Sequence, residues 1–220
     1  MLLCYITDRT QFAGDEDLRR RRLMSKVAEA VRWGVDLIQL REKDLSTREL
    51  ETLAHACLQV VRDSSLRTEN RERRTVFLIN SRVDVAIACG ADGVHLRSND
   101  ISPRDVQRIW TRAAGALAPG KAPLIGVSCH TRAQVDQAAS NGAEFAVFAP
   151  VFGKKHVPES PSAGIEALRE ACRQNLRVLA LGGVTLENAR SCIAAGAAGI
   201  AGIRLFQDAD IAQVVRTLRG

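Results

Sequence analysis

The sequence has few aromatic residues and no segment that would carry the chain into or through a membrane. Phenylalanine, tryptophan and tyrosine make up 4% of the 220 residues. Residues 1–8 run directly into an apolar stretch without a basic region or a small-residue cleavage site, so no secretion signal is predicted. Charged residues interrupt every apolar run before it reaches the roughly 20 residues that a bilayer span needs. These absences predict a cytoplasmic protein without a membrane partner.

Motifs for common nucleotide and metal sites are also missing. No G-x-G-x-x-G follows the first apolar run and no G-x-x-x-x-G-K-[ST] occurs, which removes the main support for dinucleotide or P-loop nucleotide binding. The six cysteines lie far apart, without a C-x-x-C pair or histidines at ligand spacing. We expect buried thiols in a reducing compartment at Cys4, Cys57, Cys89, Cys129, Cys172 and Cys192.

The basic character of the chain does not predict a nucleic-acid partner. The formal net charge is +6 and Arg19–Arg22 form a run of four arginines, which is the kind of cluster that binds phosphate backbones. However, the run belongs to a helical pattern whose inward positions are Leu18, Met24, Val27 and Val31. No aromatic residues interleave with the arginines to stack on bases. We therefore expect a solvated helix face.

A repeated junction organises the chain. A glycine followed by a short, apolar, β-branched run recurs four times at a spacing of about fifty residues, at Gly34, Gly90, Gly142 and Gly196. Each glycine comes after a segment of helical period, where the residue that ends a helix takes a positive φ. Each junction therefore predicts a helix, a glycine turn and a strand.

Further strands are predicted midway between these junctions, at residues 2–7, 75–80, 124–128 and 177–181. Eight strands alternating with eight helices predict a parallel sheet that is buried on both faces. Eight units without an obvious break favour closure, so we predict an α/β fold, a single (β/α)8 TIM barrel domain over residues 1–220. The alternative is a flavodoxin-like pair, which needs a linker, and residues 117–123 are the one candidate.

Polar residues at the strand ends are the expected functional site of such a barrel. On the second strand Gln39, Arg41 and Lys43 follow a period of two, so they are predicted to point one way and to bind an anion. After the seventh strand, Gly182 and Gly183 allow backbone N–H groups to approach a ligand, and the following helix N-terminus favours negative charge. Together these features predict a phosphorylated ligand.

Six segments, in the same order and over nearly the whole chain, carry a resemblance. They are YITDR at 5–9, QLREKD at 39–44, LINSRVDVAIACGADGVHL at 78–96, GVSCHT at 126–131, APVFGK at 149–154 and ALGGVTLENA at 180–189. These segments resemble the family of thiamine phosphate synthase and its relative TenI, the thiazole tautomerase. The resemblance implies an oligomeric TIM barrel of thiamine biosynthesis that acts on small phosphorylated pyrimidine and thiazole compounds.

The resemblance also implies a reaction and a set of residues. A synthase joins hydroxymethylpyrimidine diphosphate to thiazole phosphate and releases pyrophosphate, so positive charge near the leaving group is the main catalytic device expected. The implied contacts to pyrophosphate, pyrimidine and Mg²⁺ are Arg41 and Lys43, Asn80, and Asp100, respectively. Further implied substrate contacts are Ser128, Gly183, Ile203, Arg204, and either Lys154 or Lys155.

Three positions depart from the synthase pattern. Ser81 stands where synthases have a second magnesium carboxylate, and a serine is a poor magnesium ligand. The segment Gly153–His156 reads Gly-Lys-Lys-His in place of a threonine-containing motif, and Arg204 replaces a small residue. A cofactor Mg²⁺ is still expected at Asp100, weakened by the missing carboxylate.

Two alternatives to the synthase therefore stay open. One is a thiazole tautomerase in which His130 moves a proton, since a histidine pKa near ~6.5 suits acid and base chemistry at neutral pH. The other is a non-catalytic barrel that binds thiazole phosphate or thiamine phosphate, to which Ser81 points. Arg41, Lys43 and Asp100 together favour the synthase.

Overall fold

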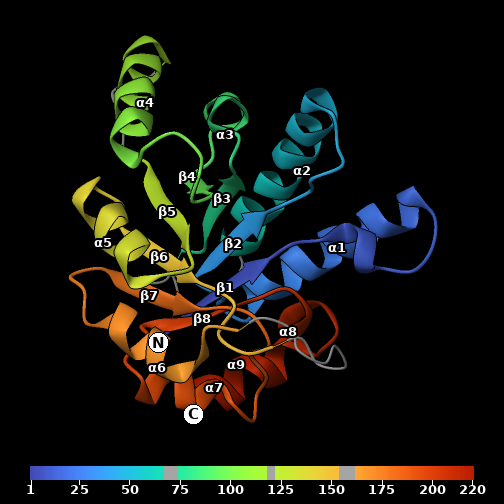
Figure 1. Cartoon of the computed structure of the whole chain (residues 1–220). Helices are drawn as coiled ribbons and strands as arrows, with labels where there is room; N and C mark the ends of the chain where they lie inside the picture. The colour runs from blue at the N-terminus through green and yellow to red at the C-terminus, as the bar shows by residue number, and fades with distance from the viewer. Residues whose placement is uncertain (67–73, 118–121, 154–161) are drawn as a thin grey trace.

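The chain folds into a closed barrel of eight parallel strands. The computed structural model describes residues 1–66, 74–117, 122–153 and 162–220. The strands follow one another around the barrel in chain order, and β8 pairs with β1 to close it. Helices surround the strands on the outside (Figure 1). The predicted (β/α)8 TIM barrel is confirmed, and closure excludes the alternative of two separate open sheets.

Seven strands fall within the segments predicted from the sequence, and β5 extends one residue beyond its predicted segment, to Cys129. They are β1 (Leu2–Ile6), β2 (Leu37–Leu40), β3 (Val76–Asn80), β4 (Gly93–Leu96), β5 (Leu124–Cys129), β6 (Phe145–Phe148), β7 (Arg177–Ala180) and β8 (Gly199–Gly202). The helices of the described residues are η1 (Arg9–Gln11), α1 (Glu16–Arg32), α2 (Thr47–Leu66), α3 (Val83–Cys89), α4 (Pro103–Leu117), α5 (Arg132–Ser140), α6 (Gly164–Cys172), α7 (Ala189–Ala194), α8 (Arg204–Gln207) and α9 (Ile211–Arg219).

The four repeated glycines lie between a helix and the next strand. Their φ angles are 73° at Gly34, 70° at Gly90, 83° at Gly142 and 103° at Gly196. An L-residue with a side chain adopts this left-handed region only at a cost. The sequence pattern located these helix ends because a residue with a positive φ is needed there, and glycine meets that need.

Apolar side chains fill the inside of the barrel as well as the layer between strands and helices. Phe145 on β6 is the largest residue of the inner cluster, which also contains Leu37, Leu78 and Leu179 from other strands. Gly126 on β5 makes room for it, since a Cβ atom at Gly126 would lie 2.1 Å from Cζ of Phe145. This glycine serves close packing inside the barrel, as expected where two elements approach too closely for a side chain.

The arginine run of α1 is held by the turn that precedes the helix. Arg19 and Arg22 donate to the carbonyl oxygens of Phe12 and Ala13 at 3.1 and 3.0 Å. Val27 and Val31 are buried and Met24 packs against the core, as predicted, whereas Leu18 is only half-buried. Leu23 and Ala30 are buried beside them, so the buried positions of α1 are Leu23, Val27, Ala30 and Val31.

The cysteines are unpaired, and all but the half-buried Cys172 are buried. Burial raises the pKa of the Cys4 and Cys129 thiols to about 12, so both stay protonated and unreactive at neutral pH. None of the helices in the described ranges has the length and apolar character of a membrane-crossing segment.

Candidate functional site

The described candidate residues lie at the carboxyl ends of the strands or in the loops that follow them. Gln39 and Ser128 belong to β2 and β5, Asn80 ends β3, and Asp100 follows β4. On the other side of the barrel mouth, the glycine pair follows β7, and Ile203 and Arg204 follow β8. Lys154 and Lys155, together with His156, lie outside the described residues.

The end of β2 carries two positive charges. The strand stops at Leu40, Arg41 is half-buried, Glu42 is buried and Lys43 is exposed in a turn. All four residues of β2 are buried, so burial begins to differ between neighbours only after the strand, in the turn that carries Lys43. In the described part of the chain neither Arg41 nor Lys43 forms an ion pair. Their charges are therefore available to an anion at the mouth.

Side-chain amides connect β2 to β3 beside these cations. Nε2 of Gln39 donates to Oδ1 of Asn80 at 2.8 Å, and Nδ2 of Asn80 donates to Oγ of Ser81 at 3.2 Å. Asn80 pairs in register with His95 on β4. Among the described residues, Oε1 of Gln39 and both ring nitrogens of His95 are buried without a hydrogen-bond partner. Buried polar atoms without partners are uncommon, so this group retains hydrogen-bonding capacity that a ligand or water can use.

Ser81 and Asp100 meet at the ends of β3 and β4. Ser81 has a left-handed φ of 59°, which is unusual for a residue with a side chain. Asp100 accepts hydrogen bonds from the Arg97 backbone N–H at 2.8 Å and from its guanidinium Nε at 3.1 Å. Partial burial alone would raise the pKa of Asp100, but hydrogen bonds from Arg97 and from the Ser81 side chain hold it below its usual value. The carboxylate is therefore ionised and already paired.

Asp100 and Ser128 also share a cavity. It has a volume of about 110 Å³ and is lined by the loop after β4, the end of β5 and helix α5. Ligand pockets usually enclose roughly 300–1,000 Å³, so this cavity is a side pocket of the mouth and too small for a whole substrate.

His130 follows β5, and a hydrogen bond from its ring to the backbone fixes its orientation. Nδ1 lies 2.6 Å from the carbonyl oxygen of Ala149. Because a carbonyl oxygen only accepts, Nδ1 must carry a hydrogen, and in the neutral ring Nε2 carries the lone pair. The His130 backbone N–H donates to Oε1 of Gln134 at 2.6 Å. The exposed imidazole is thus oriented with a basic nitrogen away from its backbone contact.

Gly182 and Gly183 are required by packing as well as by their backbone angles. Their φ angles are 94° and 61°. A Cβ atom at Gly182 would lie 2.7 Å from Cα of Pro150, and one at Gly183 would lie 2.6 Å from the carbonyl oxygen of Gly153. The loop after β7 therefore presses against the loop after β6, and this contact explains the glycines without any ligand.

The helix predicted to follow these glycines does not begin beside them. Helix α7 begins at Ala189, because Asn188 builds a turn first: its Oδ1 accepts from the Thr185 N–H at 2.8 Å, and its Nδ2 donates to the Gly183 carbonyl at 3.0 Å. The expectation of a helix N-terminus next to the glycine pair is corrected accordingly. After β8, in contrast, helix α8 starts at once with Arg204, which is exposed.

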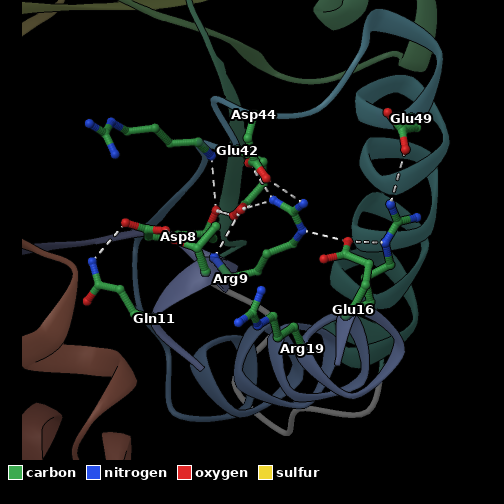
Figure 2. Close-up of polar contacts among 12 residues, drawn as sticks. Asp8, Arg9, Gln11, Glu16, Arg19, Glu42, Asp44 and Glu49 are labelled. Atoms are coloured by element: carbon green, nitrogen blue, oxygen red, sulfur yellow. Dashed lines mark hydrogen bonds and ion pairs between the residues drawn. The ribbon is translucent and has the colours of Figure 1, made fainter. Parts of the chain in front are cut away.

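A buried acidic residue under the β2 loop was missed from the sequence. Glu42 accepts a hydrogen bond from Oγ1 of Thr7 at 2.6 Å and from the Arg9 backbone N–H at 3.0 Å. Thr7 in turn accepts from the Arg41 backbone N–H at 3.0 Å. Figure 2 shows Glu42 and Arg9 at the centre of a wider network of polar contacts. The sequence did contain a signal for this. Glu42 alternates with Arg41 and Lys43, so its side chain points the other way, into the barrel wall, where a carboxylate needs a partner.

Comparison with known families gives one match over most of the chain. The family model described as Thiamine monophosphate synthase matches residues 3–206. A protein of Roseiflexus sp. (strain RS-1) named thiamine-phosphate synthase is 38% identical over 198 residues, which cover 89% of this chain and 74% of that protein.

A plant protein and a solved structure extend this similarity. A protein of Oryza sativa subsp. japonica named probable thiamine biosynthetic bifunctional enzyme, chloroplastic, is 36% identical over 184 residues. The match covers 83% of this chain but only 30% of that longer protein. The structure of thiamine phosphate pyrophosphorylase from Pyrococcus furiosus superimposes with a TM-score of 0.76 at 28% identity, covering 99% of this chain and 93% of the other.

Proposed function

The chain belongs to the thiamine monophosphate synthase family, and from this premise we propose that it joins hydroxymethylpyrimidine diphosphate to thiazole phosphate with release of pyrophosphate. It is a transferase of thiamine biosynthesis. The observation that carries the proposal is that Arg41 and Lys43 form no ion pair with the described residues and lie beside the hydrogen-bonded amides of Gln39 and Asn80. This grouping offers one place for a diphosphate and an adjacent place for a polar ring.

The cations act on the leaving group. The bond between the pyrimidine methylene carbon and the diphosphate oxygen breaks with its electron pair on oxygen, and the thiazole nitrogen then forms the new bond to that carbon. Negative charge grows on the diphosphate as the bond breaks. Arg41, which can donate two parallel hydrogen bonds, and Lys43 stabilise this charge in place before the reaction starts.

Neutral polar groups orient the two rings. Gln39 and Asn80 are fixed by their mutual hydrogen bond, and the buried Oε1 of Gln39 is left to accept from the pyrimidine. Ser128 faces the same side of the mouth, where it shares a cavity with Asp100. We assign the thiazole phosphate to Gly183, Ile203 and the exposed Arg204 on the opposite side, and we assign Lys154 or Lys155 to the diphosphate as a further cation.

Magnesium is the cofactor that the family generally uses, but the described residues of this chain provide few free oxygen ligands for it. Asp100 is the predicted ligand, but both of its oxygens accept hydrogen bonds from Arg97. Over the described ranges, no group of three histidine, cysteine or acidic side chains could hold a metal ion. Mg²⁺ prefers several oxygen ligands and gives up its bound water reluctantly. The residues therefore do not fit a preformed magnesium site, and no step above depends on one.

The test is a turnover assay with both substrates, following thiamine phosphate by chromatography. The proposal expects product from the parent protein and a large loss with Arg41→Ala, because the leaving group then loses its bidentate partner. Binding of pyrophosphate without any product, over a full range of magnesium concentrations, would instead support the non-catalytic barrel.

His130 supports a second candidate function, a thiazole tautomerase. Its Nδ1–H is fixed on Ala149, which leaves Nε2 to accept a proton from a bound thiazole. Proton exchange at the carboxylated thiazole phosphate, followed by NMR in D₂O, tests it. The tautomerase requires His130→Asn to abolish exchange, whereas the synthase tolerates that change with only a small loss of product.

We also propose a cytoplasmic location. The six cysteines are unpaired in the structure. Disulfides are rare in reducing compartments, and a secreted protein with this many thiols would be expected to pair some of them.

A further inference from the structure

Arg9 holds the carboxylates on both sides of Lys43. Its Nη1 donates to Oε2 of Glu42 at 3.1 Å and to Oδ1 of Asp44 at 2.7 Å, and its Nη2 donates to Oδ2 of Asp44 at 2.9 Å. The remaining donor, Nε, contacts Oε1 of Glu16 at 2.8 Å. Figure 2 shows the guanidinium between Glu42 and Asp44 on one side and Glu16 on the other. One arginine thus engages three carboxylates.

The centre of this cluster is closed to water. The side chains of Arg9 and Glu42 are 4% and 0% exposed, while that of Asp44 is 54% exposed. Hydrogen bonding by the Arg9 guanidinium holds the pKa of Asp44 and that of Glu16 below their usual values, so both stay ionised. Arg20 also donates to Oε1 of Glu16, at 2.6 Å, so the cluster joins three carboxylates to two arginines beneath Arg41 and Lys43.

This arrangement determines where the acidic side chains point. Glu42 and Asp44 are the sequence neighbours of Lys43, and a free carboxylate there would reach a cation of the same loop. Such a pairing would offset the positive charge that an anionic ligand needs. With Arg9 in place, the carboxylates are satisfied below the loop, and in the described ranges Arg41 and Lys43 make no ion pair.

We propose that Arg9 is a positioning residue for the diphosphate group. It sequesters Glu42 and Asp44, and this keeps Arg41 and Lys43 unpaired at the mouth of the barrel. The inference rests on the proposed function, because it assumes that these cations receive the diphosphate of the pyrimidine substrate. Arg9 itself does not touch substrate.

The test compares two variants that both lack the buried ion pair. Arg9→Gln alone would leave Glu42 buried without a cation, so the background is Arg9→Gln with Glu42→Gln, which removes both charges. Asp44 is then free in the double variant and neutral in the triple variant that adds Asp44→Asn. The probe is inorganic pyrophosphate, titrated by calorimetry at fixed ionic strength and magnesium concentration.

The double variant is expected to bind pyrophosphate about fivefold more weakly than the parent, because an exposed ion pair of this kind stabilises by up to roughly 1 kcal/mol. The triple variant is expected to recover to within about twofold of the parent. Asp44→Asn in the parent background should change binding by less than about twofold, since Arg9 already holds that carboxylate. This recovery is a readout that a purely structural role of Arg9 would not produce.

A matched control removes a comparable pair that sequesters no carboxylate of the β2 loop. Arg108 and Asp105 lie 3.4 Å apart on α4, and both are exposed. Arg108→Gln with Asp105→Asn keeps the same net charge and should leave pyrophosphate binding unchanged. Circular dichroism of all variants verifies that each is folded.

Equal binding by the double and triple variants would overturn the role of Arg9. Arg41→Ala separates this result from a failure of the proposed function. If the parent binds pyrophosphate and Arg41→Ala does not, the site stands and only the inference about Arg9 fails. If the parent binds no pyrophosphate, or Arg41→Ala binds it as well as the parent, both the inference and the diphosphate site are wrong.

Discussion

The imidazole of His95 lies parallel to the ring of Phe145 inside the barrel, with ring centroids 6.0 Å apart and planes inclined by 9°. Gly126 lies between them in the sheet and leaves space for the phenyl ring. His95 is therefore enclosed by an apolar surface on the level of Asn80, directly beneath the candidate site.

This burial makes stability depend on pH. Desolvation, with a smaller contribution from Arg41, lowers the pKa of His95 to about 4. In the unfolded chain the value returns to ~6.5, so the unfolded state binds a proton in a window where the folded state does not. Stability from this residue is complete above pH ~6.5 and falls as the pH decreases toward ~4. The total change is about 3 kcal/mol.

Denaturant unfolding at a series of pH values checks this prediction. His95→Asn should flatten the dependence between pH ~6.5 and ~4 relative to the parent. His55→Asn, on the exposed surface of α2, is the matched control and should leave the slope unchanged. Identical slopes for His95→Asn and the parent would show that His95 is not buried in its neutral form.

The cations after β2 should differ in importance. Arg41 is half-buried and can donate two hydrogen bonds, while Lys43 is an exposed point charge. We expect Arg41→Ala to lower kcat/KM for the pyrimidine diphosphate by roughly 100-fold and Lys43→Ala by roughly 10-fold. Steady-state kinetics with each substrate varied in turn measures both, and KM for thiazole phosphate should not move. Arg48→Ala, an exposed arginine of α2, controls for net charge; a comparable loss there would refute a localised effect.

Comparing Gly183 with Gly164 separates the cost of backbone strain from the cost of a steric clash. Gly183 and Gly164 have similar φ angles, 61° and 81°, but a Cβ atom at Gly164 would meet nothing within 4 Å. Gly164→Ala should therefore destabilise by about 1 kcal/mol from backbone strain alone. Gly183→Ala adds a backbone clash with Gly153 and should destabilise by about 3 kcal/mol. Chemical denaturation measures the free energy of unfolding of both variants. Equal destabilisation would mean that the loops after β6 and β7 can move apart to accept the added methyl group.

The already paired Asp100 predicts weak metal binding by the free protein. Titration of Mg²⁺ into the protein without substrate should give no saturable heat below about 1 mM, because one carboxylate is a poor site without substrate phosphates. Arg97→Ala removes the competing guanidinium and should strengthen magnesium binding. Tight binding by the parent that disappears in Asp100→Asn would contradict this prediction and establish a preformed site.

The fold was predictable because its signals are local. Each junction glycine reports a backbone angle that the sequence shows directly, and the apolar runs that follow mark the strands. On α1 the periodicity placed Met24, Val27 and Val31 correctly, but Leu18, in the first turn, is only half-buried. The burial of Leu18 depends on how far along the helix it lies, and the apolar periodicity carries no information about that position.

The site was harder to predict because its contacts join distant segments. Arg9 and Glu42 are 33 residues apart, and nothing in either segment identifies the other as a partner. The glycine pair was interpreted through backbone access to a ligand, yet Pro150 and Gly153 explain it by packing. His95 lies on a predicted strand, and only its three-dimensional neighbours reveal that its nitrogens are buried without partners among the described residues.

Closure of the barrel by β1 and β8 has a consequence during synthesis. The two strands lie about 200 residues apart in the sequence, and Leu2 through Tyr5 pair with Gly199 through Gly202. At ribosomal rates of about 5–20 residues per second, β1 has no partner on this side for about 10–40 s after it emerges. An unpaired strand edge recruits other chains. The nascent protein therefore meets its greatest risk of aggregation before β8 leaves the ribosome, and a chaperone that covers β1 would raise the yield of folded enzyme.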